Sequence, residues 1–427
     1  MTILLMLVGL FALILINVPI GVALGVVGVV AMVVTQGTGV LSNVGLVMFE
    51  GARSFPLLAI PMFIFAGALM NASSISRRLF AFASALLGFI RGGLAMVNIG
   101  VSMFFSEISG SAVAGVAATA PVLIPAMHKR GYPRPFSAAV TSSSATLAII
   151  LPPSIPLILY GVMAEVSIVQ LFVAGIVPGL VTGFLMMLLS YYFARRYGWP
   201  VEEVFDLCRL WVTFKEAFWA LLLPLIILGG IFGGIVTATE GGAMAVVAAL
   251  FIGAFIYRDL DMRFLYCAVV EGATQTAVVM LLVAASALVG VYLTEMRLPQ
   301  QLATAIMALT ENQYAILAML NVFFLVIGLF LHSAAAIILV VPVVMPLITA
   351  VGIDPIHFGI VLCLNLSVGQ QTPPVASVLV TTCAIAKADI WEVTRANLPF
   401  IALLVAVLLL VTYVPEIPLV FIEMFYR

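Results

Sequence analysis

Polar side chains gather at four interruptions of an otherwise apolar sequence, and their types suit the binding of small ions. Proline cannot donate a backbone N–H and clashes with the preceding turn, so carbonyls upstream of a proline pair lose their helical partners. Released carbonyls, together with Ser, Thr and Asn oxygens, form a hard-oxygen cage suited to Na⁺. The four interruptions are Ser109-Gly110-Ser111, the run from Thr141 through Ser142, Ser143 and Ser144 to Pro152-Pro153, His332-Ser333, and the run from Asn365 through Ser367, Gly369, Gln370, Gln371 and Thr372 to Pro373-Pro374.

The same interruptions predict a site for an anionic substrate. A helix that restarts after a break directs about half a unit of positive charge toward that break. Such N-termini are predicted near Ser111, Pro153, Ser333 and Pro374, and together they can hold an anion without an arginine. No Lys or Arg falls in the predicted membrane interior. Ser144 is a further candidate substrate contact, with helix packing as the alternative, because small and hydroxyl residues are common packing contacts in membrane helices.

Ionisable residues near these breaks allow more than one interpretation. His332 either binds substrate or caps a half-helix. Glu107, close to the first break, either handles a proton or cation or makes a structural hydrogen bond. Glu50, Glu240 and Glu271 are predicted to lie at the membrane interface or at loop ends.

The composition identifies the environment of these sites. The chain has 427 residues, of which 64% are hydrophobic and 8% charged, and its mean hydropathy is +1.30. Long apolar runs predict an all-α polytopic membrane protein and exclude a transmembrane barrel, whose segments alternate in polarity. The N-terminus has neither a basic region nor a small-residue cleavage site and is predicted to stay as a first span. The net charge of −1 is uninformative about partners, and no nucleic-acid partner is expected.

An enzyme is not expected from this sequence. His128, His332 and His357 fall mostly in predicted loops, and no HExxH, GxGD or similar arrangement is present. The cysteines have no metal-binding or redox spacing and are predicted to fill the core. They are Cys208, Cys267, Cys363 and Cys383.

An internal repeat at an offset of 221 residues fixes the predicted architecture. Pairs of prolines at one offset are hard to obtain by chance from 22 prolines. At this offset Pro121 falls on Pro342, Pro125 on Pro346, Pro152-Pro153 on Pro373-Pro374, and Glu50-Gly51-Ala52 on Glu271-Gly272-Ala273.

Each repeat is predicted to combine spans, interfacial arms, a hairpin and a broken helix. The first repeat, residues 1–194, has spans near 3–17, 19–35, 55–72 and 167–194, arms near 43–53 and 76–90, a hairpin at 94–127 and a broken helix at 136–164. A charged cytoplasmic loop, 195–219, connects the repeats. The second repeat, 220–427, has spans at 220–237, 240–257 and 398–420, an arm and span at 264–294, an arm at 298–310, a hairpin at 313–350 and a broken helix at 356–387.

The hairpins determine the predicted topology. The apolar pieces on either side of Ser109–Ser111 are each predicted to be too short to cross a bilayer, which takes about 20 residues. A hairpin that enters and turns back does not cross, so each repeat crosses five times and the second repeat is inverted, as in secondary transporters. With the N-terminus outside, the inside loops hold 14 of the 17 Lys and Arg residues, in agreement with the positive-inside rule. The first hairpin then opens inward and the second outward.

At these residues the chain resembles the large membrane subunit, M or DctM type, of tripartite ATP-independent periplasmic (TRAP) transporters. The resemblance spans essentially the whole chain. It is carried by SEISGSAVAGVAATAPVLIPAM, the SSS…LPPS run, VGQQTPP and NVPIGVALG.

The resemblance implies a Na⁺-coupled importer of small organic anions, such as C4-dicarboxylates, sialic acid or other sugar acids, in the bacterial inner membrane. It implies an elevator mechanism, in which a transport domain of both hairpins and both broken helices slides against a scaffold of the remaining spans. It also implies two partner proteins, a small four-helix membrane subunit (Q type), expected here as a separate chain, and a periplasmic substrate-binding protein (P type).

The resemblance further implies one Na⁺ near each hairpin tip, with the substrate between the tips. By position, the first site involves Ser109, Gly110, Ser143 and Pro152. The second involves His332, Ser333, Gly369 and Thr372. The alternatives are a stand-alone Na⁺- or H⁺-coupled anion carrier of the same fold superfamily that needs no binding protein, and a channel.

Overall fold

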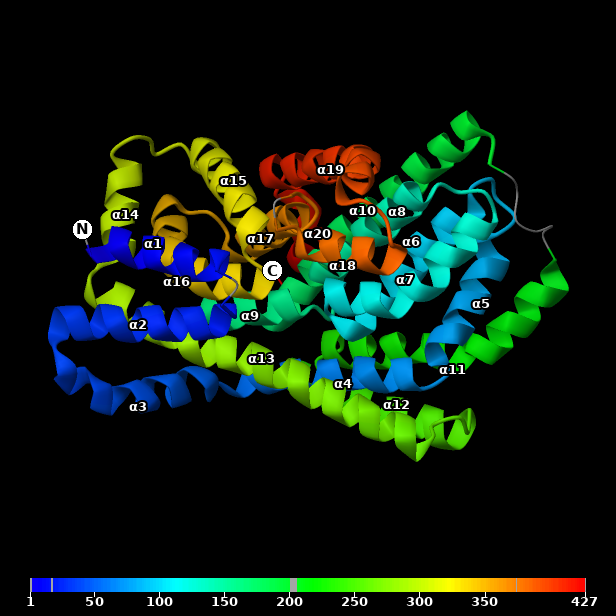
Figure 1. Ribbon diagram of the computed structural model, residues 1–427, viewed down its shortest axis with the longest axis horizontal. Helices are drawn as coiled ribbons and strands as arrows, with labels where there is room; N and C mark the ends of the chain where they lie inside the picture. Colours follow the sequence, from blue (N-terminus) through cyan, green and yellow to red (C-terminus); the bar gives the residue numbers. More distant parts are fainter. Residues whose placement is uncertain (1, 17, 200–205, 374, 427) are drawn as a thin grey trace.

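The computed structural model of this chain describes residues 2–16, 18–199, 206–373 and 375–426, and the elements that it contains are helices (Figure 1). The first half contains α1 (Thr2–Leu15), α2 (Ile20–Gln36), η1 (Thr38–Val40), α3 (Leu41–Ala52), η2 (Phe55–Leu58), α4 (Ala59–Ala72), α5 (Ile75–Leu87), α6 (Gly93–Ser109), α7 (Ala112–Lys129), α8 (Arg134–Ala145), η3 (Thr146–Ile149), α9 (Ile155–Met163) and α10 (Ile168–Tyr197).

The second half contains α11 (Leu207–Phe232), α12 (Ala238–Phe251), the π-helical turn η4 (Ile252–Ile256), α13 (Met262–Glu295), α14 (Leu298–Met307), α15 (Gln313–Phe330), α16 (Ser333–Val351), α17 (Pro355–Gly369), α18 (Ser377–Ala386), α19 (Ile390–Tyr413) and α20 (Glu416–Phe425). Among the described residues, nine helices are long and apolar enough to cross a membrane. The prediction of an all-helical polytopic membrane protein is therefore confirmed.

Helix boundaries recur at the offset found in the sequence. Helix α6 ends at residue 109 and α15 at residue 330, α7 begins at 112 and α16 at 333, and α8 begins at 134 and α17 at 355, each a difference of 221. Local chemistry sets several of these starts. Ser154 accepts from the N–H of Leu157 to begin α9, and Asp354 accepts from the N–H of Ile356 to begin α17, which satisfies N–H groups that have no partner in the first turn of a helix.

Four predicted segments differ from the structure. Residues 207–219 of the predicted connecting loop are helical and form the start of α11, which Asp206 caps by accepting from the N–H of Cys208. The predicted arm and span at 264–294 form one continuous helix, α13. The predicted span at 398–420 is divided between α19 and α20, which Pro415 separates. Helix α7 has 18 residues and by length and composition alone could cross a membrane, contrary to the expectation that it is too short.

The helices pack in two groups. Helix α13 lies along α2, α3 and α4, while α4 packs on α12 and α11 on α5; this group occupies the lower part of Figure 1. The hairpin and broken-helix elements pack on one another above it, with α7 on α8 and α18, α15 on α17, and α16 on α9. Helices α10 and α19 contact α8 and α17 from the other side. This packing brings the four interruptions together inside the molecule.

Candidate functional site

The tip of the first hairpin is held by backbone and side-chain hydrogen bonds. Helix α6 stops at Ser109, and Gly110 has φ +56°, a left-handed conformation that favours glycine. Ser111 then caps α7 by accepting from the N–H of Ala114 at 3.5 Å. The N–H of Ile155 donates to the Gly110 carbonyl at 3.3 Å. The hairpin tip is therefore joined directly to the start of α9, the second half of the first broken helix.

The second hairpin has the corresponding arrangement. His332 caps α16, with Nδ1 accepting from the N–H of Ala334 at 3.4 Å. The N–H of Val375 donates to the Leu329 carbonyl at 3.2 Å, which joins this hairpin to the second broken helix between α17 and α18. Both tips are thus tied to a broken helix through main-chain groups.

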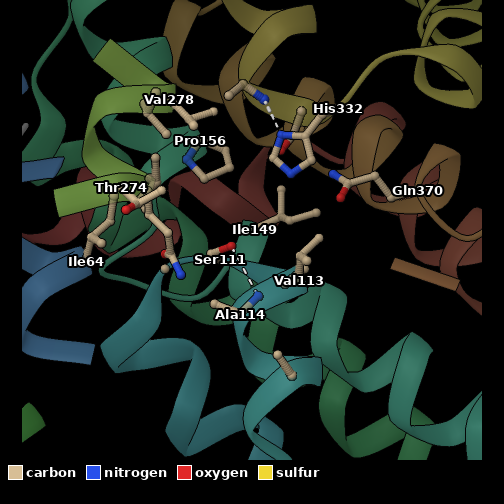
Figure 2. A pocket seen from close by; sticks show the side chains of 18 of the residues that line it. Ile64, Ser111, Val113, Ala114, Ile149, Pro156, Thr274, Val278, His332 and Gln370 are labelled. Atoms are coloured by element: carbon tan, nitrogen blue, oxygen red, sulfur yellow. Dashed lines mark hydrogen bonds between the residues drawn. The ribbon is translucent and has the colours of Figure 1, made fainter. Parts of the chain in front are cut away.

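One cavity of about 330 Å³ lies between the two tips, and we call it the central cavity. Ser111 lines it from the first tip, and His332 and Ser333 line it from the second. Figure 2 shows Ser111, His332 and Gln370 around this space, with Thr274 on the side opposite to His332 and Gln370. No lysine or arginine is among the described residues that line it. Segments more than 200 residues apart in sequence therefore build a single site.

Helix α13 contributes a polar wall that the sequence analysis did not assign to the site. Glu271, Thr274 and Gln275 line the central cavity, and Gln275 Nε2 donates to Glu271 Oε1 at 3.1 Å. Glu271 does not lie at a loop end, one of the two predicted positions, because it falls within the continuous helix α13. The signal was present in the sequence, since polar residues spaced i, i+3 and i+4 share one helix face.

The hydroxyl cluster of α8 forms a buried network with the second repeat. Ser142 Oγ donates to Gln371 Oε1 at 2.6 Å, and Gln371 Nε2 donates back to the Ser142 carbonyl at 2.7 Å. Ser143 Oγ donates to Asn397 Oδ1, and Asn397 Nδ2 donates to Gln371 Oε1 at 3.0 Å. These four residues are fully buried. The network therefore ties the first broken helix to the second and to α19.

Only some of the predicted substrate-binding residues line the central cavity. Ser111 and Ser333 line the central cavity. Ser144 does not; it is fully buried and its hydroxyl lies 2.8 Å from that of Ser102, because this face of α8 packs on α6. Pro153 is buried just before the Ser154 cap of α9 and is not among the cavity-lining residues. Pro374 lies outside the described residues.

The residues predicted for the first Na⁺ site do not all lie at the central cavity. Gly110 lines the central cavity, whereas Ser143 is occupied with Asn397 in the buried network. Pro152 is buried and joined to Pro153 by a cis peptide bond. The side chains of Ser109 and Glu107 lie outside the described part of the chain.

The second predicted Na⁺ set lies around one break. His332 and Ser333 line the cavity, Gly369 packs against Gly328, and Thr372 Oγ1 donates to the Val368 carbonyl at 3.0 Å. Because the helix cap engages His332 Nδ1, that nitrogen is a poor candidate ligand. Two oxygens of α17, Asn365 Oδ1 and Ser367 Oγ, are buried without a partner among the described residues. A donor set of hydroxyl, amide and carbonyl oxygens fits a hard cation such as Na⁺.

A second cavity of about 460 Å³ adjoins the central one along α7, and we call it the side cavity. Ala114, Ala117 and Glu271 line both. From there the side cavity runs past Thr119 to the start of α5, where Arg77 lines it. The small side chains on this face of α7 leave the space open beside the first hairpin.

Comparison with known proteins places this architecture among transporters. The family described as "Tripartite ATP-independent periplasmic transporter, DctM component" matches residues 7–417. The chain is 44% identical over 418 residues to the isethionate TRAP transporter permease protein DctMQ of Oleidesulfovibrio alaskensis, covering 97% of this chain and 65% of that relative's length. It is 37% identical over 372 residues to the C4-dicarboxylate TRAP transporter large permease protein DctM of Pseudomonas aeruginosa, covering 87% of each.

A solved structure has the same fold at low sequence identity. The crystal structure of the Alcanivorax borkumensis YdaH transporter matches with a TM-score of 0.66 and 16% identity, covering 88% of each chain.

Proposed function

The chain belongs to the family of DctM components of TRAP transporters, the large permease subunits, and we propose that it is the transport subunit of a Na⁺-coupled importer of small organic anions. The observation that carries this proposal is the cavity that both hairpin tips line. Helix N-termini at Ser111 and Ser333 face that cavity, and such termini attract anions. The described residues that line the site include no lysine or arginine, so its hydrogen-bond donors are neutral. Such a site fits an anion that is transported together with cations.

We infer the substrate class from relatives and from cavity size. The relatives' names refer to a sulfonate, isethionate, and to C4-dicarboxylates, which are small anions with oxygen-rich head groups. A central cavity of about 330 Å³ is at the lower end of small-molecule sites, near 300–1,000 Å³. Sialic acid and other sugar acids belong to the same chemical class.

Na⁺ coupling is proposed from the oxygen donors at the two breaks. Serine hydroxyls and helix-end carbonyls adjoin both tips, and the unpartnered oxygens of Asn365 and Ser367 lie on the second broken helix. Cations held beside the substrate offset its negative charge in a low-dielectric interior. Import then draws its energy from the Na⁺ gradient.

An inverted repeat with an elevator motion is consistent with the packing of the two hairpins. Helix α16 packs directly on α13 and α14, whereas its counterpart α7 borders the side cavity. In an inverted repeat, the opposite state exchanges these two environments. With the N-terminus outside, the side cavity leads toward the inner face, so this conformation is open inward. The hairpins and broken helices form the transport domain, and the remaining spans form the scaffold.

A cysteine at Val122, an exposed residue that lines the side cavity, tests this direction. In a variant with the exposed Cys208 and Cys267 replaced by serine, Val122→Cys should react with a membrane-impermeant thiol reagent in inside-out vesicles. Reaction from the periplasmic side alone would contradict the proposed topology.

Membership of a tripartite family implies partner subunits, and we propose the small four-helix membrane subunit and a periplasmic binding protein. The location that follows is the bacterial inner membrane, with a periplasmic N-terminus.

Reconstitution tests the function directly. Uptake of an organic anion into proteoliposomes should need Na⁺, the small subunit and the loaded binding protein. Ser111→Leu or Thr372→Leu should abolish it without loss of membrane insertion. Rapid uptake by this chain alone would instead indicate a stand-alone carrier. Uptake that needs no Na⁺ gradient and does not saturate with the binding protein would indicate a channel.

A further inference from the structure

Gln370 presents a buried amide nitrogen to the central cavity. The residue directly follows the end of α17 and is 1% exposed. Its Nε2 has no hydrogen-bond partner among the described residues, although Gln370 lines the cavity. Figure 2 shows its amide directed into the space beside His332. A buried donor without a partner carries a desolvation penalty, which a ligand in the cavity can relieve.

The other end of the same amide is engaged. Ser377 Oγ, in the first turn of α18, donates to Gln370 Oε1 at 3.3 Å, and the Gln370 backbone N–H donates to the Leu366 carbonyl at 3.1 Å. With the oxygen turned toward Ser377, both N–H groups of the amide are directed away from it. Ser377 therefore acts as a positioning residue for the donor.

The neighbouring glutamine provides a contrast. The side chain of Gln371 is bonded at both its oxygen and its nitrogen within the buried network with Ser142 and Asn397. Its role in the structure is to connect helices. Gln370, one residue earlier, lines the central cavity, and its Nε2 has no partner in the described part of the chain.

We propose that the Gln370 amide donates a hydrogen bond to the carboxylate or sulfonate of the transported anion. This inference rests on the proposed function and adds a residue that discriminates anions from neutral analogues. A neutral amide supplies a donor without a fixed positive charge, so it binds the anion without holding it as strongly as an arginine would. Hydrogen bonds to charged groups are about twice as strong as those between neutral groups.

The test compares wild type with Gln370→Leu, Gln370→Asn and Gln370→Glu. Succinate and isethionate, as sodium salts, are titrated onto the purified chain, and the shift in its thermal unfolding midpoint gives an apparent affinity. Gln370→Leu should bind about 10- to 100-fold more weakly, Gln370→Asn should retain part of the affinity, and Gln370→Glu should lose binding because two negative charges meet. Ser377→Ala should weaken binding and Ser377→Thr should restore it.

A matched control separates this effect from a general loss of stability. Gln301→Leu, at an exposed glutamine of α14, should leave anion binding unchanged. Without anion, Gln370→Leu should unfold at or above the wild-type temperature, since it removes an unpaired buried donor. Wild-type affinity for both anions in Gln370→Leu would overturn the inference, while Na⁺-driven uptake by that variant would leave the proposed function standing. Absence of Na⁺-driven uptake by the wild-type complex would overturn the function itself.

Discussion

Alanine in place of Gly369 perturbs the second hairpin at the contact between α15 and α17. A Cβ built on Gly369 would lie 2.5 Å from Gly328 Cα and 2.7 Å from its carbonyl oxygen, whereas a Cβ on Gly328 would lie 3.1 Å from Gly369 Cα. Ordinary van der Waals contact begins near 3.4 Å. Gly369→Ala must therefore separate the two helices by about 0.9 Å and Gly328→Ala by about 0.3 Å.

Both separations exceed what a cation site tolerates, and that of Gly369→Ala does so by the larger margin. Ligand distances in metal sites hold to within about 0.2 Å, and Gly369 is one residue from Gln370 in the cavity wall. Overpacking of this kind costs about 1–3 kcal/mol. If that penalty falls on the Na⁺-bound state, it corresponds to roughly 5- to 150-fold in Na⁺ affinity. We expect Gly369→Ala to raise the half-saturating Na⁺ concentration by roughly 5- to 150-fold, and Gly328→Ala to raise it less.

The assay is anion uptake into proteoliposomes as a function of Na⁺ concentration, with unfolding midpoints measured in detergent. Gly115→Ala is the control, because this glycine of α7 has nothing within 4 Å of its built Cβ and alanine is the better helix former. Wild-type Na⁺ dependence in Gly369→Ala would refute the reasoning. So would a larger effect of Gly328→Ala, since the order follows directly from the two distances.

Three further predictions concern the other contacts of the site. Gly110→Ala should reduce uptake by at least tenfold in the same vesicles, because the position has φ +56° and its Cβ would lie 3.1 Å from the Ile155 nitrogen; wild-type uptake would show that the first tip tolerates displacement. Asn397→Leu should lower the unfolding free energy by about 2–4 kcal/mol, since it removes the acceptor of the buried Ser143 hydroxyl and one of the two donors to Gln371 Oε1; chemical denaturation that finds no loss would show that the buried network does not stabilise the fold. Ser144→Ala should leave substrate affinity unchanged and lower stability by only about 1 kcal/mol, because Ser144 faces Ser102 and not the cavity; weaker anion binding in the thermal-shift titration would return Ser144 to the substrate site.

The sequence predicted the helices and their interruptions because both depend on local chemistry. Apolar runs must be helical in a bilayer, since no water is present to satisfy backbone groups. Proline and glycine interrupt helices through their own covalent structure. The breaks at Ser109–Ser111 and His332-Ser333 accordingly fall within a residue or two of the observed helix ends.

Some boundaries depended on more than the local sequence. Polar and charged residues at 207–219 resembled a loop, yet they continue as α11, which packs on α5. The arm and span expected at 264–294 join into α13 because its neighbours α2, α3 and α4 support one continuous helix along its length.

Residue types and spacing alone determined that this is a helical membrane protein with four polar breaks arranged as a repeat, and they drew attention to Ser111, His332 and Ser333. Only the tertiary structure decided which polar groups share the cavity: Glu271 enters it from α13, Gln370 presents to it an amide nitrogen without a partner among the described residues, and Ser143 and Ser144 are turned away. The physical reason is that a break in a helix is encoded by neighbouring residues, whereas the direction of a side chain depends on which distant helix packs against its face. The hydroxyls of Ser143 and Ser144 form their hydrogen bonds with Asn397 and Ser102 across such helix contacts. They are therefore not available to a substrate in the central cavity.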